Sequence, residues 1–158
     1  MSDKINNIFS KILVAIDGSQ PSIDAANYAI EMAKKNNNSQ LIALTVLDIS
    51  TPRRLSSSFI TAPTYGLKEL EEERKRAQKW LESISNKVKE IEKNIQYKAE
   101  IIEGSISVEA TIVNYAENEN IDLIVIGTKG RSGFKKMLLG SVASKVVTYA
   151  TCPVLVIK

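Results

Sequence analysis

Four of the seven glycines of the chain lie between residues 127 and 140. They are Gly127, Gly130, Gly133 and Gly140; lysine and arginine side chains lie among them, and Ser141 follows the last one. A single turn requires only one or two glycines. Several glycines combined with positive charge and a hydroxyl group favour a backbone that surrounds an anion such as phosphate.

Each part of this segment has a physical role in that hypothesis. Gly127 ends an apolar run, and the missing Cβ would let a ligand lie against the backbone. Gly130 and Gly133 permit positive φ angles that turn successive N–H groups inward as an anion-binding nest. Gly140 and Ser141 begin the last expected helix, whose free N–H groups and positive dipole end favour phosphate. The alternative is an ordinary glycine-rich turn followed by a helix N-cap at Ser141, and the local pattern alone fits both.

The chain contains no histidine and one cysteine, Cys152. Histidine is the commonest general base and transition-metal ligand, so Ser-His and Cys-His catalytic pairs are excluded and a structural zinc site is disfavoured. Catalysis in this chain would have to use carboxylates, lysine, arginine or a magnesium-type ion. A single cysteine also excludes an internal disulfide and fits a reducing compartment.

The composition is that of a water-soluble globular protein of about one domain. Hydrophobic residues make up 44% and charged residues 25% of 158 residues, and the formal net charge is +3. This charge is too small to indicate a nucleic-acid or membrane partner. No apolar run approaches the ~20 residues of a membrane span, and the first residues are too polar for a signal peptide. We therefore expect a cytoplasmic protein.

Hydrophobic patterning predicts strands that alternate with helices. We expect buried strands over 11–17, 41–48, 97–102, 122–126 and 153–157. Helical spacing predicts a helix capped by Ser19, a long charged helix over 67–94, and two helices near 108–116 and 142–149. Residues 49–66 have no clear period and predict a long loop. The alternation predicts one α/β domain over 1–158, with a parallel sheet covered by helices on both faces.

Ligands of open α/β sheets bind beyond the carboxyl ends of the strands, where the strand order reverses. The segment after the first strand is Asp17-Gly18-Ser19-Gln20, which is not the G-x-G-x-x-G of dinucleotide-binding folds. The chain also lacks the G-x-x-x-x-G-K-[ST] of P-loop nucleotide hydrolases. Both of these classes are disfavoured.

The glycine spacing, G-x-x-G, nine residues and then G-S, resembles the nucleotide-binding signature of universal stress proteins. The resemblance extends to KILVAIDGS at the first strand, LIALTVLD at the second and CPVLVIK at the end. It implies an open five-stranded parallel sheet in the order 3-2-1-4-5. Because that order reverses between strands 1 and 4, Asp17 and Gly127 would face each other across the crevice.

The resemblance also implies an adenine nucleotide as ligand, expected here to be ATP with Mg²⁺ or Mn²⁺; AMP and cyclic AMP are the alternatives. Asp17 would lie near the ribose or the bound cation, beside Ala15, and the backbone of Val46 would contact adenine. Ribose and phosphates would be wrapped by residues 126–133, namely Ile126, Gly127, Thr128, Gly130, Arg131, Ser132 and Gly133. The phosphate tail would be held by Gly140, Ser141, Val142 and Ala143. Relative to common family members, Lys129 replaces a histidine and Gln20 a glutamate.

Three classes of function remain after this comparison. The resemblance favours a nucleotide-dependent regulatory module of the stress response, which forms a homodimer through the apolar last strand and acts on an unknown protein partner. A slow ATP-hydrolysing enzyme of the same fold is the second class. A scaffold that binds only protein is the third. The absence of histidine, and of a clear base other than Asp17, makes us expect little turnover.

Two of the selected residues also have simple structural explanations. An aspartate before a glycine, as at Asp17, commonly forms an Asx turn. Trp80 lies on the long charged helix, where packing is a more frequent role than stacking on a ligand. The charged run from Glu71 to Arg76 is most simply a solvated helix face with intrahelical ion pairs.

Overall fold

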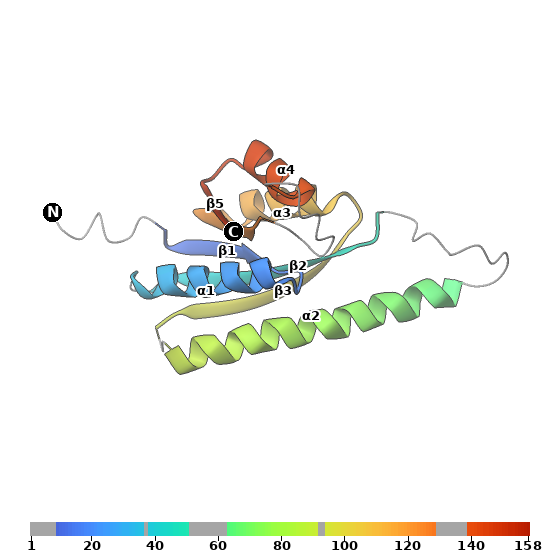
Figure 1. Cartoon of the computed structure of the whole chain (residues 1–158), viewed down its shortest axis with the longest axis horizontal. Coiled ribbons are helices and arrows are strands. Elements are labelled where there is room, and N and C mark those ends of the chain that lie inside the picture. The colour runs from blue at the N-terminus through green and yellow to red at the C-terminus, as the bar shows by residue number, and fades with distance from the viewer. Residues whose placement is uncertain (1–8, 37, 51–62, 92–93, 129–138) are drawn as a thin grey trace.

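The chain alternates strands and helices along its whole length, as Figure 1 shows. The computed structural model describes residues 9–36, 38–50, 63–91, 94–128 and 139–158. Its strands are β1 (Lys11–Ala15), β2 (Gln40–Asp48), β3 (Gln96–Gly104), β4 (Leu123–Gly127) and β5 (Val154–Ile157). Its helices are α1 (Gln20–Lys34), α2 (Pro63–Ile91), α3 (Val108–Asn118) and α4 (Ser141–Tyr149).

The five strands form one parallel sheet in the order β3-β2-β1-β4-β5. This order confirms the predicted 3-2-1-4-5 arrangement. Strand β1 lies at the centre, with Leu13 beside Ile42 of β2 on one side and beside Ile124 of β4 on the other. The chain therefore changes direction across the sheet between β1 and β4, where a ligand crevice is expected in this class of fold.

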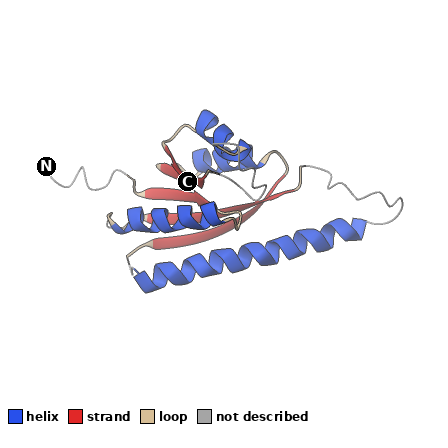
Figure 2. Cartoon of the chain, viewed as in Figure 1, coloured by secondary structure: helices blue, strands red, loops and turns tan. Residues whose placement is uncertain are grey.

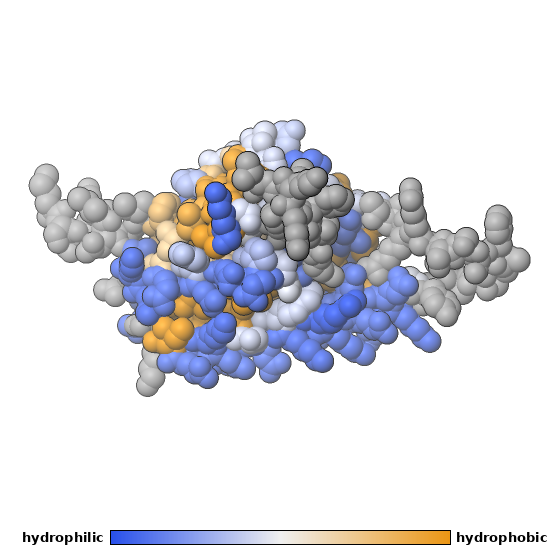
Figure 3. Space-filling view, in the orientation of Figure 1, coloured by the Kyte–Doolittle hydropathy of each residue, from blue (hydrophilic) through white to orange (hydrophobic). Residues whose placement is uncertain are grey.

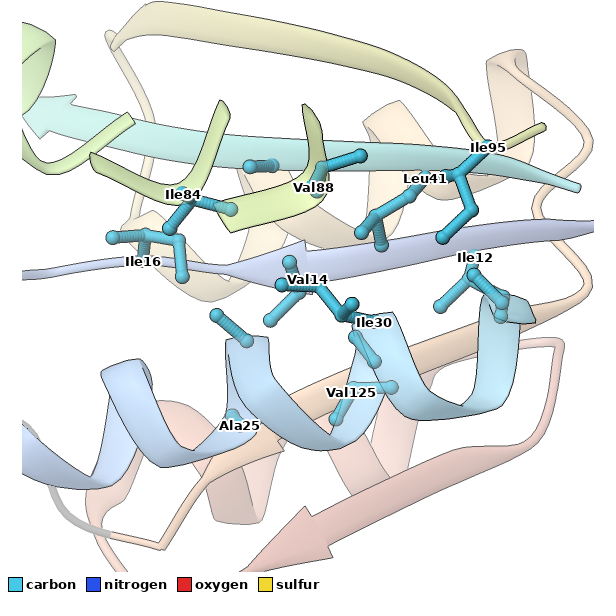
Figure 4. Packing of buried hydrophobic residues seen from close by; sticks show 14 of the residues in the cluster. Ile12, Val14, Ile16, Ala25, Ile30, Leu41, Ile84, Val88, Ile95 and Val125 are labelled. Atoms are coloured by element: carbon cyan, nitrogen blue, oxygen red, sulfur yellow. The ribbon is translucent and has the colours of Figure 1, made fainter. Parts of the chain in front are cut away.

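Helices cover both faces of the sheet, which Figure 2 shows as blue helices on either side of the red strands. Alternate residues of each strand point to opposite faces. Ile12 and Val14 point toward α1 and α2, and Figure 4 shows them beside Ile30 of α1 and Val88 of α2. Leu13 belongs to the second core, with α3 and α4. The central strands β1, β2 and β4 are thus buried on both sides, which explains their nearly continuous apolar sequences, whereas the edge strand β3 is partly exposed and carries charged residues.

Helices α1 and α3 begin at serine residues whose side chains cap them. The Ser19 hydroxyl accepts a hydrogen bond from the N–H of Ser22 at 3.3 Å, and the Ser107 hydroxyl accepts one from Ala110 at 3.4 Å. These bonds satisfy N–H groups that have no acceptor inside the helix. The predicted N-cap at Ser19 is confirmed.

The long helix α2 differs from its predicted bounds. It runs from Pro63 to Ile91, whereas the sequence predicted 67–94 and assigned 63–66 to the loop. Proline is well tolerated in the first turn of a helix, because its missing N–H would have no partner there, and Gly66 does not prevent the helix from starting. The rest of the predicted 49–66 loop includes residues 51–62, which lie outside the described part of the chain.

Between Gly66 and Ile91, helix α2 buries one apolar stripe, and its other side chains are partly or fully exposed. Ala77, Leu81, Ile84 and Val88 are buried against the sheet. Hydrophilic side chains cover the lower margin of the molecule in Figure 3, where α2 lies in Figure 1. No helix in the described residues is both long enough and apolar enough to cross a membrane.

Candidate functional site

Several of the predicted site residues that the structure describes lie near the carboxyl edge of the sheet. Ala15 ends β1 and Ile126 is the next-to-last residue of β4, while Val46 lies near the end of β2. All three pack in the apolar cluster on the α3/α4 face, and this cluster also includes Val142 and Ala143 of α4. Five residues that are far apart in the sequence thus line one region beside the reversal of strand order.

Asp17 lies just beyond β1, in a turn that its own carboxylate stabilises. Its Oδ1 accepts hydrogen bonds from the N–H of Ser19 at 2.9 Å and from the Ser19 hydroxyl at 2.5 Å. Gly18 between them has a φ of +80°, a conformation that glycine adopts at little cost. The Asx-turn alternative is therefore correct as a description of the local structure. Since both donors converge on Oδ1, the turn also fixes the direction in which Oδ2 points.

The turn is tied to α1 by further hydrogen bonds. The Ser22 hydroxyl donates to the backbone oxygen of Ser19 at 2.8 Å, and the N–H of Asp17 approaches that hydroxyl at 3.4 Å. Ser22 is buried, so these bonds form away from solvent. Asp17 is held at the edge of the crevice by the first turn of the helix that follows it.

The structure gives a different reason for a glycine at position 127 from the predicted one. A Cβ placed on it would lie 2.7 Å from the backbone carbon of Pro21 and 2.8 Å from the Pro21 Cβ. The missing side chain therefore admits the start of α1, not a ligand, on that face of β4. Gly127 as a ligand contact through its backbone stays a prediction.

Backbone hydrogen bonds join Thr128, which follows β4, to Gly140, which precedes α4. The N–H of Gly140 donates to the backbone oxygen of Thr128 at 2.6 Å, and the N–H of Thr128 donates to Ile157 at 2.8 Å. Thr128 is buried, and these bonds hold the N-terminus of α4 beside the end of β4. The predicted contacts Gly130, Arg131, Ser132 and Gly133 lie outside the described residues, and their role stays a prediction.

Helix α4 begins without a side-chain cap, unlike α1 and α3. Its N-cap is Gly140, and the first N–H that donates within the helix is that of Ser144, to Gly140 at 2.9 Å. The N–H groups of Ser141, Val142 and Ala143 precede that bond and have no acceptor inside the helix. These are the residues predicted to hold the phosphate tail, although Val142 and Ala143 also pack in the core.

One ion pair joins α4 to α3 next to this region. Lys145 Nζ lies 2.7 Å from Glu109 Oε1. Partial burial raises the pKa of Glu109, but the hydrogen bond from Lys145, with the backbone and Ser107, outweighs it and leaves that pKa below its usual value. The same bond raises the pKa of Lys145. Both groups are therefore charged at neutral pH, and their ion pair links α4 to α3.

Within the described residues, no three side chains of histidine, cysteine, aspartate or glutamate lie together as a metal site. Asp17, the predicted cation ligand, is thus one carboxylate beside backbone groups. A cation there would have to take its other ligands from a bound molecule and water.

The sequence did not predict that Trp80 of α2 would contact the Asp17-Gly18-Ser19 turn. A Cβ at Gly18 would lie 2.2 Å from Cζ2 and 2.3 Å from Cε2 of Trp80, so the indole ring of α2 covers Gly18. The prediction that Trp80 packs is confirmed, since it contacts the core on the α1/α2 face. Its contact with the Asp17 turn was missed because nothing in the sequence spacing connects residues 18 and 80.

The sequence model of the universal stress protein family matches residues 9–158. The chain belongs to the universal stress protein family. Two curated universal stress proteins are each 36% identical to it. One is MJ0531 of Methanocaldococcus jannaschii, of which the alignment covers 84%, and the other is YxiE of Bacillus subtilis, of which it covers 100%. Both alignments cover 96% of this chain.

Solved structures agree with the family assignment. The universal stress protein UspA from Lactobacillus plantarum superposes with a TM-score of 0.79 at 29% identity, over 95% of this chain and 98% of that one. More distant structures of the same fold include an Archaeoglobus fulgidus universal stress protein in complex with dAMP and an Arabidopsis thaliana family member with AMP bound. Each has a TM-score of 0.64 at 20% identity; they cover 96% and 94% of this chain, and 99% and 91% of their own. A further universal stress protein, at 21% identity, is in complex with cAMP.

Proposed function

We propose that this universal stress protein binds ATP, together with Mg²⁺ or Mn²⁺, at the carboxyl edge of the sheet between β1 and β4. One observation carries the proposal. The N-terminus of α4 has no side-chain cap, and the bond between Gly140 and Thr128 holds it at the reversal of strand order. Free N–H groups and the positive end of the helix dipole favour phosphate at such a position.

The adenosine end of the nucleotide would lie against the apolar part of the site. Ala15 and Val46 are partly exposed members of the α3/α4-side cluster and lie near the ends of neighbouring strands. Relatives of this fold solved with AMP, dAMP and cAMP support an adenine nucleotide as the ligand class. The backbone of Val46 would contact adenine, and the carboxylate of Asp17 would accept a hydrogen bond from the ribose or bind the cation.

The chain would act as a nucleotide-dependent regulatory module of the stress response in the cytoplasm, with little or no turnover. We expect a homodimer through β5, which is an edge strand of the sheet, and an unidentified protein partner. Val154, Leu155 and Val156 of β5 are only partly buried within one chain. An edge strand with apolar side chains is readily covered by another copy.

The test of nucleotide binding uses Gly140→Pro, with Gly140→Ala as its matched control. Gly140 has φ −67°, which proline also adopts, so proline removes the N–H that donates to Thr128 without requiring a new φ at this position. Alanine keeps that N–H. We expect wild type and Gly140→Ala to release adenine nucleotide on denaturation and to bind ATP in calorimetry, and Gly140→Pro to bind about tenfold more weakly or not at all. Equal binding by Gly140→Pro, with the fold intact by circular dichroism, would show that ATP binding does not depend on the bond that holds α4 beside β4, and would contradict the observation that carries the proposal.

A further inference from the structure

We infer that Trp80 is a positioning residue for nucleotide binding, because its indole ring holds the Asp17-Gly18-Ser19 turn in the conformation that presents Asp17 to the ligand. The inference rests on the proposed function and adds a residue from α2, a helix that contributes none of the predicted contacts.

The contact between Trp80 and Gly18 is close and involves the ring face. Three adjacent ring atoms, Cζ2, Cε2 and Cη2, lie 2.2, 2.3 and 2.7 Å from the position a Cβ would take on Gly18. No side chain fits between this ring and the backbone, and the φ of +80° independently favours glycine. Trp80 is partly buried, and its ring closes the turn on the side facing α2.

The direction of α2 makes this contact part of a regular helix–strand interface. Figure 4 shows Ile84 of α2 beside Ile16, two residues before Gly18. Trp80 and Ile84 are four residues apart on α2, about 6 Å along the helix, and Ile16 and Gly18 are two residues apart in the segment that follows β1. Trp80, one helical turn before Ile84, therefore lies over Gly18, because α2 runs opposite to β1. The buried stripe of α2 fixes where the ring lies.

The turn is thus held from two sides. Serine hydroxyl groups at the start of α1 bind its backbone and the Oδ1 of Asp17, and Trp80 covers Gly18 from α2. If the ring is removed, Gly18 can change its φ and ψ angles, since glycine adopts both positive and negative φ readily. Removal of the ring would let Gly18 sample other conformations, and Asp17 would no longer be directed at one position.

The alternative is that Trp80 only stabilises the core, and a double-mutant cycle separates the two roles. The variants are Trp80→Ala, Asp17→Asn and the double variant, measured by calorimetry with ATP and Mg²⁺. A matched control is Ile84→Ala, which removes a buried side chain of the same helix that lies beside Ile16. Trp80→Phe, which keeps an aromatic ring, tests for rescue.

We expect Trp80→Ala to weaken ATP binding about tenfold, Ile84→Ala to change it by less than about twofold, and Trp80→Phe to restore most of the loss. In the Asp17→Asn background, the loss of Trp80 should have almost no further effect, because groups that act through one another are not additive. Additive losses, or an equal loss in Ile84→Ala, would overturn the positioning role. If wild type fails to bind ATP at all, the proposed function falls, and this inference with it.

A spectroscopic measurement tests the contact without nucleotide. The α-proton of Gly18 that occupies the direction of a Cβ lies against the indole ring and should be shifted upfield by the ring current, in a protein with only seven glycines and one tryptophan. The shift should vanish in Trp80→Leu, which also serves in the binding cycle if Trp80→Ala does not fold. Ordinary Gly18 shifts in the wild type would overturn the inference.

Discussion

At position 18, both the backbone conformation and the packing of Trp80 require glycine. Its φ is +80°, and the Trp80 ring occupies the direction of a Cβ. Gly18→Ala should therefore lower the free energy of unfolding by about 2–4 kcal/mol, because positive φ and overpacking both add to the cost. Gly66→Ala is the matched control, since a Cβ there has no neighbour within 4 Å and the position is exposed in α2.

Alanine in a helix interior is favoured over glycine, so Gly66→Ala should raise stability by about 0.5–1 kcal/mol. Urea titration of the two variants measures both effects. A neutral Gly18→Ala would show that the ring does not lie on Gly18 in solution.

Asp17 is the residue that tests whether the site hydrolyses ATP. It is the predicted carboxylate ligand of the cation, and the described residues hold no group of three metal-ligating side chains. Transfer of the γ-phosphoryl group needs a positioned water and charge neutralisation beyond a phosphate nest. We expect single-turnover hydrolysis of ATP well below ~1 per second, the lower end of the usual enzyme range. Rapid phosphate release that disappears in Asp17→Asn would instead identify an enzyme.

At the scale of elements, the ion pair between α3 and α4 gives a pH-dependent prediction. The pKa of Glu109 is lowered in the folded protein, so its stabilising effect is present above the unfolded pKa of about 4.3 and is lost as the pH falls through the folded value. Glu109→Gln should therefore be less stable than wild type at pH 7, and the difference should begin to shrink near the unfolded pKa of about 4.3 and vanish only at a pH below the folded pKa. Thermal unfolding across this pH range measures it. Lys145→Gln should show the same dependence, and a difference that persists at low pH would contradict the ion-pair origin.

The positions of strands and helices were the features that the sequence predicted most accurately. The five strands were predicted within about two residues. Continuous apolar runs mark the central strands β1, β2 and β4, because a strand buried on both faces rarely contains a charged residue in its centre, whereas the edge strand β3 carries Lys98 and Glu100. The predicted start of α2 was wrong because residues 49–66, which include Pro63, have no clear period and were assigned to a loop, although proline fits a first helical turn. The strand order came from resemblance to a family, since hydrophobic periodicity carries no information about which strands are neighbours.

The candidate site was predicted unevenly for a related reason. Residues that follow strand ends, such as Asp17 and Thr128, are predictable because parallel strands end at one edge of the sheet. The packing of Trp80 on Gly18 and of Pro21 on Gly127 depends on how helices lie over the sheet. Those contacts join distant segments, and no local spacing in the sequence indicates them.

The whole molecule has an apolar strand at one edge of its sheet. Figure 3 shows apolar side chains grouped near the position of β5 in Figure 1, and Val154, Leu155 and Val156 are partly buried in the single chain. We expect a homodimer, and Val156→Lys should shift it toward monomer by placing a charge at this edge. Asn114→Lys adds the same charge at an exposed position of α3 and should leave the dimer unchanged.

Light scattering at micromolar concentration measures the assembly, and circular dichroism confirms that each variant is folded. A stable wild-type monomer at that concentration would contradict the proposed interface.

The central claim, that the glycine segment and the start of α4 hold ATP, is tested most directly by calorimetric titration of ATP and Mg²⁺ into wild type and Gly130→Val. The variant places a branched side chain in the predicted phosphate nest and disfavours positive φ. We expect one site per chain with micromolar affinity in the wild type, about −7 to −8 kcal/mol, and no binding by a folded Gly130→Val. Indistinguishable titrations of the two proteins, or no heat of binding in the wild type, would contradict the account.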